Sequence, residues 1–113
     1  MSQLEEELAF QLKACGIEFE REYKFCQGRR GRADFYIKPM ILVEVEGIIY
    51  KPKLGQKSRH TTPKGFEDDC IKYAEAQLLQ FTLLRFTSNQ IKQGIALDYI
   101  SRMIEIKREW NGR

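Results

Sequence analysis

The sequence predicts an α/β fold in which helices flank a mixed β-sheet. Three observations support this class. Apolar residues recur at helical spacing near both ends of the chain, short stretches in the first half alternate apolar and polar residues as half-buried strands do, and a helical stretch precedes the last predicted strand. The chain has 113 residues, 42% of them hydrophobic, so we expect one domain over residues 1–113 with a modest core.

The first half predicts a helix followed by three strands. Leucine recurs every four residues over 3–14, which indicates a helix, and Gly16 is a typical residue just after a helix end. Period-two alternation predicts a strand over 17–25, and two further strands are expected over 33–37 and 41–45. The third is the most continuously apolar, which favours a central position, and the short turns between the strands predict an antiparallel meander.

The second half predicts a helix over 66–80, a strand over 81–86 and a helix from an N-cap at Ser88 to about Glu109. The helical crossover allows the last strand to pair in parallel with the third. The residues expected to face inward from the first of these helices are Phe66, Cys70, Tyr73, Ala74 and Leu78, with Asp69 and Lys72 off the stripe. Those expected from the last helix are Ile91, Ile95, Tyr99 and Met103.

The net charge of +3 is concentrated in one segment, because residues 51–64 hold five basic side chains and no acidic one. Such a segment suits a polyanion such as a phosphate backbone, and a solvated basic loop is the alternative. The basic residues are Lys51, Lys53, Lys57, Arg59 and Lys64.

Composition also indicates what the chain is not. Three cysteines without CxxC spacing make a disulfide framework or a zinc site unexpected, and Cys15 and Cys70 fit small core positions in helices. No apolar run approaches the roughly 20 residues that span a bilayer, and the acidic start does not resemble a secretory signal. We expect no membrane partner, no small-molecule cofactor and a cytoplasmic location, in a bacterial or phage-infected cell.

Three carboxylates in the predicted strands are the strongest functional signal. Asp34 lies within an apolar strand, and Glu44 and Glu46 flank Val45 at the end of the next one, so both glutamates point to one face. Carboxylates in half-buried strands are costly unless they are paired or bind a cation. A divalent metal would relieve their repulsion, bind a phosphate oxygen and lower the pKa of a bound water. The pattern therefore predicts metal-dependent phosphodiester hydrolysis, with a solvated sheet edge as the alternative.

These residues belong to an ordered series of matches, from about residue 4 to residue 87, that resembles the PD-(D/E)XK (restriction-endonuclease-like) nuclease superfamily. The closer likeness is to small phage and prophage resolvase-like endonucleases. The matching segments are Leu4-Glu5, Gln11-Leu12, Arg21-Glu22-Tyr23, Arg32-Ala33-Asp34-Phe35, Val43-Glu44-Val45-Glu46-Gly47, Arg59-His60-Thr61, Gly65-Phe66-Glu67, Asp69-Cys70, Lys72-Tyr73 and Leu84-Arg85-Phe86-Thr87.

The resemblance implies an αβββαβα three-layer core and a Mg²⁺ cofactor for which Mn²⁺ substitutes. Asp34, Glu44 and the carbonyl of Val45 would be metal ligands. Glu5 would orient a metal-bound water or complete the coordination shell, unless it belongs to a solvated acidic face of the first helix.

The chain departs from the superfamily motif at position 46, where glutamate replaces the usual lysine. Glu46 is then a catalytic residue in its own right, or its presence indicates that the lysine has moved to the next helix. Lys72 is the candidate for the relocated lysine, Lys64 is the other possibility, and the alternative for Lys72 is a surface ion pair with Asp69.

The resemblance makes DNA, duplex or branched, the expected partner, and a homodimer is plausible because resolvase-like members cut as dimers. We expect an Mg²⁺-dependent DNA endonuclease that is structure-selective (Holliday-junction-resolvase-like or nicking), as in phage recombination or DNA repair. A decayed nucleic-acid-binding module and a ribonuclease are the alternatives. DNA contacts are expected from the basic residues of 51–64, from His60, which could also assist proton transfer, and from Arg29, Arg30 and Arg32.

Overall fold

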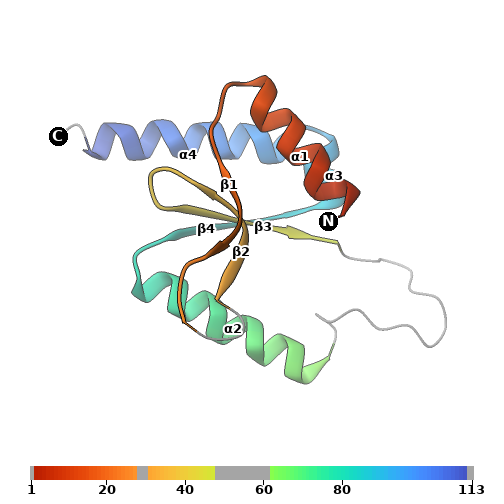
Figure 1. Cartoon of the computed structure of the whole chain (residues 1–113), viewed down its shortest axis with the longest axis vertical. Helices are drawn as coiled ribbons and strands as arrows, with labels where there is room; N and C mark the ends of the chain where they lie inside the picture. Colours follow the sequence, from red (N-terminus) through yellow and green to blue (C-terminus); the bar gives the residue numbers. More distant parts are fainter. Residues whose placement is uncertain (1, 28–30, 48–61, 112–113) are drawn as a thin grey trace.

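The computed structural model describes residues 2–27, 31–47 and 62–111, and Figure 1 shows a sheet with helices on both of its faces. The strands are β1 (Glu20–Lys24), β2 (Arg32–Ile37), β3 (Ile41–Glu46) and β4 (Thr82–Thr87). The helices are α1 (Gln3–Ala14), α2 (Pro63–Leu78), α3 (Ser88–Lys92) and α4 (Ile95–Asn111). In Figure 1, α1, α3 and α4 lie on one side of the strands and α2 lies on the other.

The sheet has the strand order β1-β2-β3-β4, in which β1, β2 and β3 pair antiparallel and β3 pairs in parallel with β4. This confirms the predicted α/β class, the meander and the parallel pairing after a helical crossover. β3 is the most continuously buried strand because it has neighbours on both edges and helices over both faces. Glu44 and Glu46 lie at its carboxyl end.

The two faces of the sheet bury different amounts of apolar surface. On the side of α1, α3 and α4, fully buried side chains such as Leu8, Phe35 and Ile100 belong to one cluster. On the side of α2 the cluster is smaller, with Ala76 of the helix and Phe81 among its few buried residues. Because so little apolar packing holds α2, polar contacts contribute much of the specificity with which it sits on the sheet.

The predicted last helix is two helices, which corrects the sequence-based prediction. Thr87, not Ser88, is the N-cap of α3 and forms a capping box with Gln90. Gly94 then takes a φ of +80°, a left-handed conformation that ends the first helix and changes the direction of the chain.

The interruption also changes the helical phase, so the inward face of α4 differs from the predicted one. Ile100 and Ile104 are buried, whereas Ile95 is 36% and Tyr99 50% exposed. Of the four residues expected to face inward, Ile91 alone is fully buried, and Met103 packs at the edge of the cluster.

Of the five residues predicted to face inward from α2, Tyr73 alone faces the sheet, and the prediction for the rest of the stripe is wrong. Phe66 and Leu78 are 63% and 77% exposed, whereas Asp69 is buried. The stretch of sheet beneath the helix carries glutamates, so the helix turns Lys72 and Tyr73 toward them instead of its most apolar face. Cys70 lies on the exposed side, and Cys15 is exposed as well, so neither is the core residue that was expected.

Among the described residues, no helix combines the length and the apolar character needed to cross a bilayer. Several predicted site residues lie outside the described ranges. They are Arg29, Arg30, Lys51, Lys53, Lys57, Arg59 and His60.

Candidate active site

Asp34 and Glu44 face each other across β2 and β3. The register that pairs Phe35 with Val43, continued by one residue, brings Asp34 opposite Glu44, and their carboxyl groups share a hydrogen bond. The backbone N–H of Val45 donates to Asp34 Oδ2 at 2.7 Å, which fixes the orientation of the carboxyl group. Burial raises the pKa of Asp34, against the hydrogen bond from Val45, which lowers it.

Lys72 supplies the cation for Glu44. Its ammonium group forms an ion pair with Glu44 Oε1, and both side chains are almost completely buried. Burial nevertheless raises the pKa of Glu44 from 4.5 to about 8, against the positive charge of Lys72, which lowers it. The second helix thus brings its lysine to the predicted carboxylates, and the expected surface pair with Asp69 is replaced by this contact.

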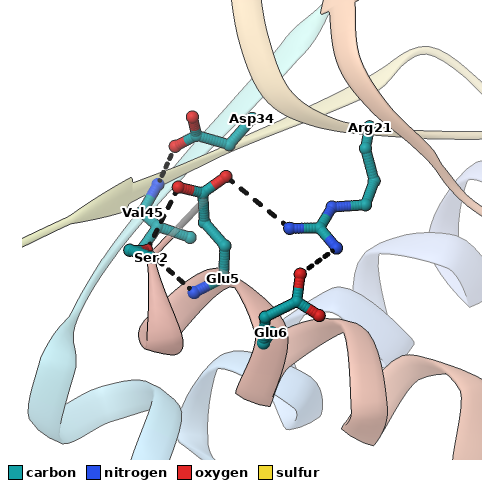
Figure 2. A network of polar contacts seen from close by, with 6 residues as sticks. All are labelled: Ser2, Glu5, Glu6, Arg21, Asp34 and Val45. Carbon is teal, nitrogen blue, oxygen red and sulfur yellow. Dashed lines mark hydrogen bonds and ion pairs between the residues drawn. The ribbon is translucent and has the colours of Figure 1, made fainter.

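Glu5 approaches Asp34 from the first turn of α1, as Figure 2 shows. Ser2 is the N-cap of the helix, and its hydroxyl accepts from the Glu5 N–H and donates to Glu5 Oε2, both at 3.1 Å. Arg21 approaches Glu5 Oε1 at 3.9 Å but forms its short contact, 2.7 Å, with Glu6. Glu5 is therefore oriented toward the site, whereas the neighbouring Glu6 is exposed and holds the arginine.

Glu22 is a fourth carboxylate at this place, and it was not predicted from the sequence. By the register of β1 and β2, residue 22 lies opposite residue 34. One ligand oxygen each from Glu5, Glu22 and Asp34 lie within 4.8 Å of one another. Glu22 has a φ of +50°, an uncommon conformation within a strand. In the sequence it looked like any polar residue of an alternating strand, and a backbone conformation of this kind has no sequence signature outside glycine and asparagine.

Glu46 lies apart from this group, with partners of its own. Its carboxylate accepts from Arg85 Nε at 2.9 Å and from the Tyr73 hydroxyl at 3.4 Å. The guanidinium of Arg85 also lies 4.5 Å from the centre of the Tyr73 ring. Burial and the charge of Glu46 raise the pKa of Tyr73, so the phenol stays protonated and remains a donor. The sequence signal for Arg85, an arginine inside an apolar strand, was present but went unused.

Two further predicted residues can be located, and neither lies among the carboxylates. Lys64 is 86% exposed and approaches Asp68 one turn further along α2, at 3.8 Å. Arg32 begins β2 opposite Lys24, with its side chain exposed. Of the two lysines considered for the missing motif position, Lys72 is the one that contacts a carboxylate of the site.

The donor set around Asp34 fits a hard divalent cation. Oxygen ligands from several carboxylates are what Mg²⁺ and Mn²⁺ take, with the remaining positions filled by water. Glu5 Oε1 is buried and accepts no hydrogen bond within the described part of the chain, so it retains a lone pair for a cation or its water. Asp34 is common to the pair with Glu44 and the group with Glu5 and Glu22, which makes it the centre of the site.

The fold has a counterpart among solved structures. The chain resembles a structure described as "Homing Endonuclease I-Bth0305I Catalytic Domain", with a TM-score of 0.60 over 93% of this chain and 92% of that one. The likeness is one of fold. At 17% sequence identity it does not extend to individual residues. No protein-family model and no curated protein sequence matches the chain.

Proposed function

We propose that this chain is a metal-dependent endonuclease that hydrolyses DNA phosphodiester bonds, with Asp34 at the centre of its metal site. The observation that carries the proposal is the meeting of four carboxylates from three strands and a helix at one end of the sheet. Asp34 bonds to Glu44, and its carboxylate lies within 4.8 Å of those of Glu5 and Glu22. A bound divalent cation would relieve the repulsion among these carboxylates, and the fold resembles that of a homing endonuclease catalytic domain.

Bound Mg²⁺ would lower the pKa of a coordinated water and neutralise charge that develops on the phosphodiester. Asp34 and Glu44, with the Val45 carbonyl, are the proposed ligands, as the superfamily resemblance implies. Glu5 would accept a hydrogen bond from the attacking water, since Ser2 holds its carboxylate toward Asp34. The Lys72 ammonium, which pairs with Glu44 in the metal-free chain, would donate to the phosphate or the attacking water when Glu44 is occupied by a metal.

A cleavage assay tests this function. Wild type and Asp34→Ala are incubated with linear, nicked and four-way DNA in Mg²⁺, Mn²⁺ or EDTA. We expect wild type to cleave when Mg²⁺ or Mn²⁺ is present and not in EDTA. Asp34→Ala should lower the cleavage rate about a hundredfold or more, because Asp34 is common to the pair with Glu44 and the group with Glu5 and Glu22. Asp98→Ala is the matched control, since Asp98 is an exposed carboxylate on α4 that approaches Arg102 one turn further along the helix. Equal inertness of wild type and Asp34→Ala on all three substrates would refute the enzymatic function.

One observation favours a second candidate, a nucleic-acid-binding module without catalysis. Glu44 and Glu46 are compensated by Lys72 and Arg85, so the sheet end retains less free negative charge than its sequence suggests. A module of this kind binds DNA no more tightly in Mg²⁺ than in EDTA and leaves it intact. RNA run beside DNA in the same assay distinguishes a ribonuclease from either.

A further inference from the structure

The guanidinium of Arg85 is held by Glu46 and Tyr73 on one side and is open to solvent on the other. Within the described part of the chain, Arg85 donates a hydrogen bond to Glu46, and the donor is its Nε–H. The guanidinium carbon of Arg85 also lies 4.5 Å from the centre of the Tyr73 ring, so the ring packs against the guanidinium. A guanidinium carries five N–H donors, so four remain on the two terminal nitrogens. The side chain is 47% exposed, so these donors can reach a ligand in solvent.

The position of Arg85 relates this cation to the acidic site. Residues 44 and 85 are partners in the parallel register of β3 and β4, and residue 34 follows on the next strand. Asp34, Glu44 and Arg85 therefore form one row across three strands, each about 4.8 Å from the next. A cation held rigidly beside paired carboxylates is the arrangement that a phosphate needs when its other oxygens face a metal.

We propose that Arg85 is a substrate-phosphate contact: Glu46 and Tyr73 hold its guanidinium so that its terminal nitrogens donate to a phosphate oxygen at or next to the Asp34–Glu44 pair. Glu46, which stands where a lysine is expected, is then the anchor of the cation that serves the phosphate. The inference rests on the proposed function in one respect, that the ligand is a nucleic-acid phosphate.

Binding of a short fluorescein-labelled DNA duplex in EDTA, measured by anisotropy at several salt concentrations, tests the contact without cleavage. We expect Arg85→Met to weaken binding at least about tenfold and to reduce the slope of log affinity against log salt by about 0.9, as the loss of one phosphate contact does. Arg102→Met is the matched control, because Arg102 also stacks on a tyrosine and pairs with an aspartate, but on α4. Its affinity and salt slope should equal those of wild type.

A double variant separates phosphate binding from a structural role. If Arg85 only neutralises Glu46, then Glu46→Gln with Arg85→Met removes both charges and restores binding. If Arg85 contacts phosphate, the double variant stays as weak as Arg85→Met. Restored binding in the double variant, or an unchanged salt slope in Arg85→Met, overturns the inference.

Cleavage measured on the same proteins separates this inference from the proposed function. If wild type cleaves DNA and Arg85→Met leaves the DNA affinity and the salt slope unchanged, the proposed function stands and the inference about Arg85 is wrong. A wild type that binds DNA through Arg85 but never cleaves removes the function and leaves the contact. A wild type that neither binds nor cleaves DNA removes both.

Discussion

Glu44→Gln should abolish a fall in stability that wild type shows between mildly acidic and mildly basic pH in the absence of metal. Burial raises the pKa of Glu44 to about 8 in the folded chain, from 4.5 when it is solvated. Between these values the folded state binds a proton that the unfolded state releases, so protonation favours folding. The contribution is fully present below pH 4.5 and is lost as the pH rises through about 8.

The size of this effect follows from the two pKa values. At about 1.4 kcal/mol per pH unit, the shift corresponds to at most about 5 kcal/mol, which is comparable with the whole stability of a small domain. Glutamine keeps the shape of the side chain and carries no charge at any pH. Glu44→Gln should therefore match wild type near pH 5 and exceed it near pH 9.

Urea unfolding in EDTA, followed by circular dichroism from about pH 5 to about pH 9, measures the difference. Glu46→Gln is the control of similar burial, and it should retain the wild-type fall because Glu44 is unchanged. A wild-type stability that is flat over this range, or a fall that persists in Glu44→Gln, contradicts the environment described for Glu44.

Three further predictions concern α2 and the last two helices. Lys72→Met should move the fall in stability to higher pH, since the charge that lowers the pKa of Glu44 is gone, and the same unfolding series reads the shift. In urea unfolding, Ile100→Ala should lower the free energy of unfolding by about 2–5 kcal/mol and Tyr99→Ala by at most about 1 kcal/mol, because Ile100 is buried and Tyr99 is half exposed. Equal losses in the two variants would contradict the inward face described for α4. Gly94→Ala should lower the free energy of unfolding by about 1 kcal/mol, because alanine is strained at a positive φ although nothing lies within 4 Å of the added Cβ. An unchanged midpoint of thermal unfolding would contradict the left-handed conformation at Gly94.

The sequence predicted the sheet well because its strands are short, close in sequence and patterned with a period of two. The antiparallel meander and the parallel pairing of β4 with β3 follow from the connection lengths alone. The helices were predicted less well. Gly94 interrupts what looked like one helix, and a shift of one residue in helical phase exchanges Ile100 for Tyr99 as the core residue.

The face of α2 was mispredicted for a different reason. The predicted stripe is more apolar than the side of the helix that carries Asp69 and Lys72, so pattern alone favours burying the whole stripe, which consists of Phe66, Cys70, Tyr73, Ala74 and Leu78. The structure instead turns Lys72 toward Glu44 and Tyr73 toward Glu46 on the sheet beneath the helix. Hydrophobic periodicity records burial but not the charge of the surface against which a helix packs.

The acidic site was predictable in part. Asp34 and Glu44 stood out because carboxylates in apolar strands need a reason. Glu22 did not, since its proximity to Asp34 depends on strand register and a left-handed backbone conformation. The pairing of Glu46 with Arg85 was also beyond the sequence, because nearly forty positions separate them along the chain.

A crystal structure of the protein soaked in Mn²⁺, with anomalous diffraction to locate the ion, tests the proposed metal site directly. We expect an anomalous peak in contact with both Asp34 and Glu44, and a Lys72 ammonium that has left Glu44. A crystal that takes up Mn²⁺ elsewhere and retains the Lys72–Glu44 pair would contradict the proposed metal site.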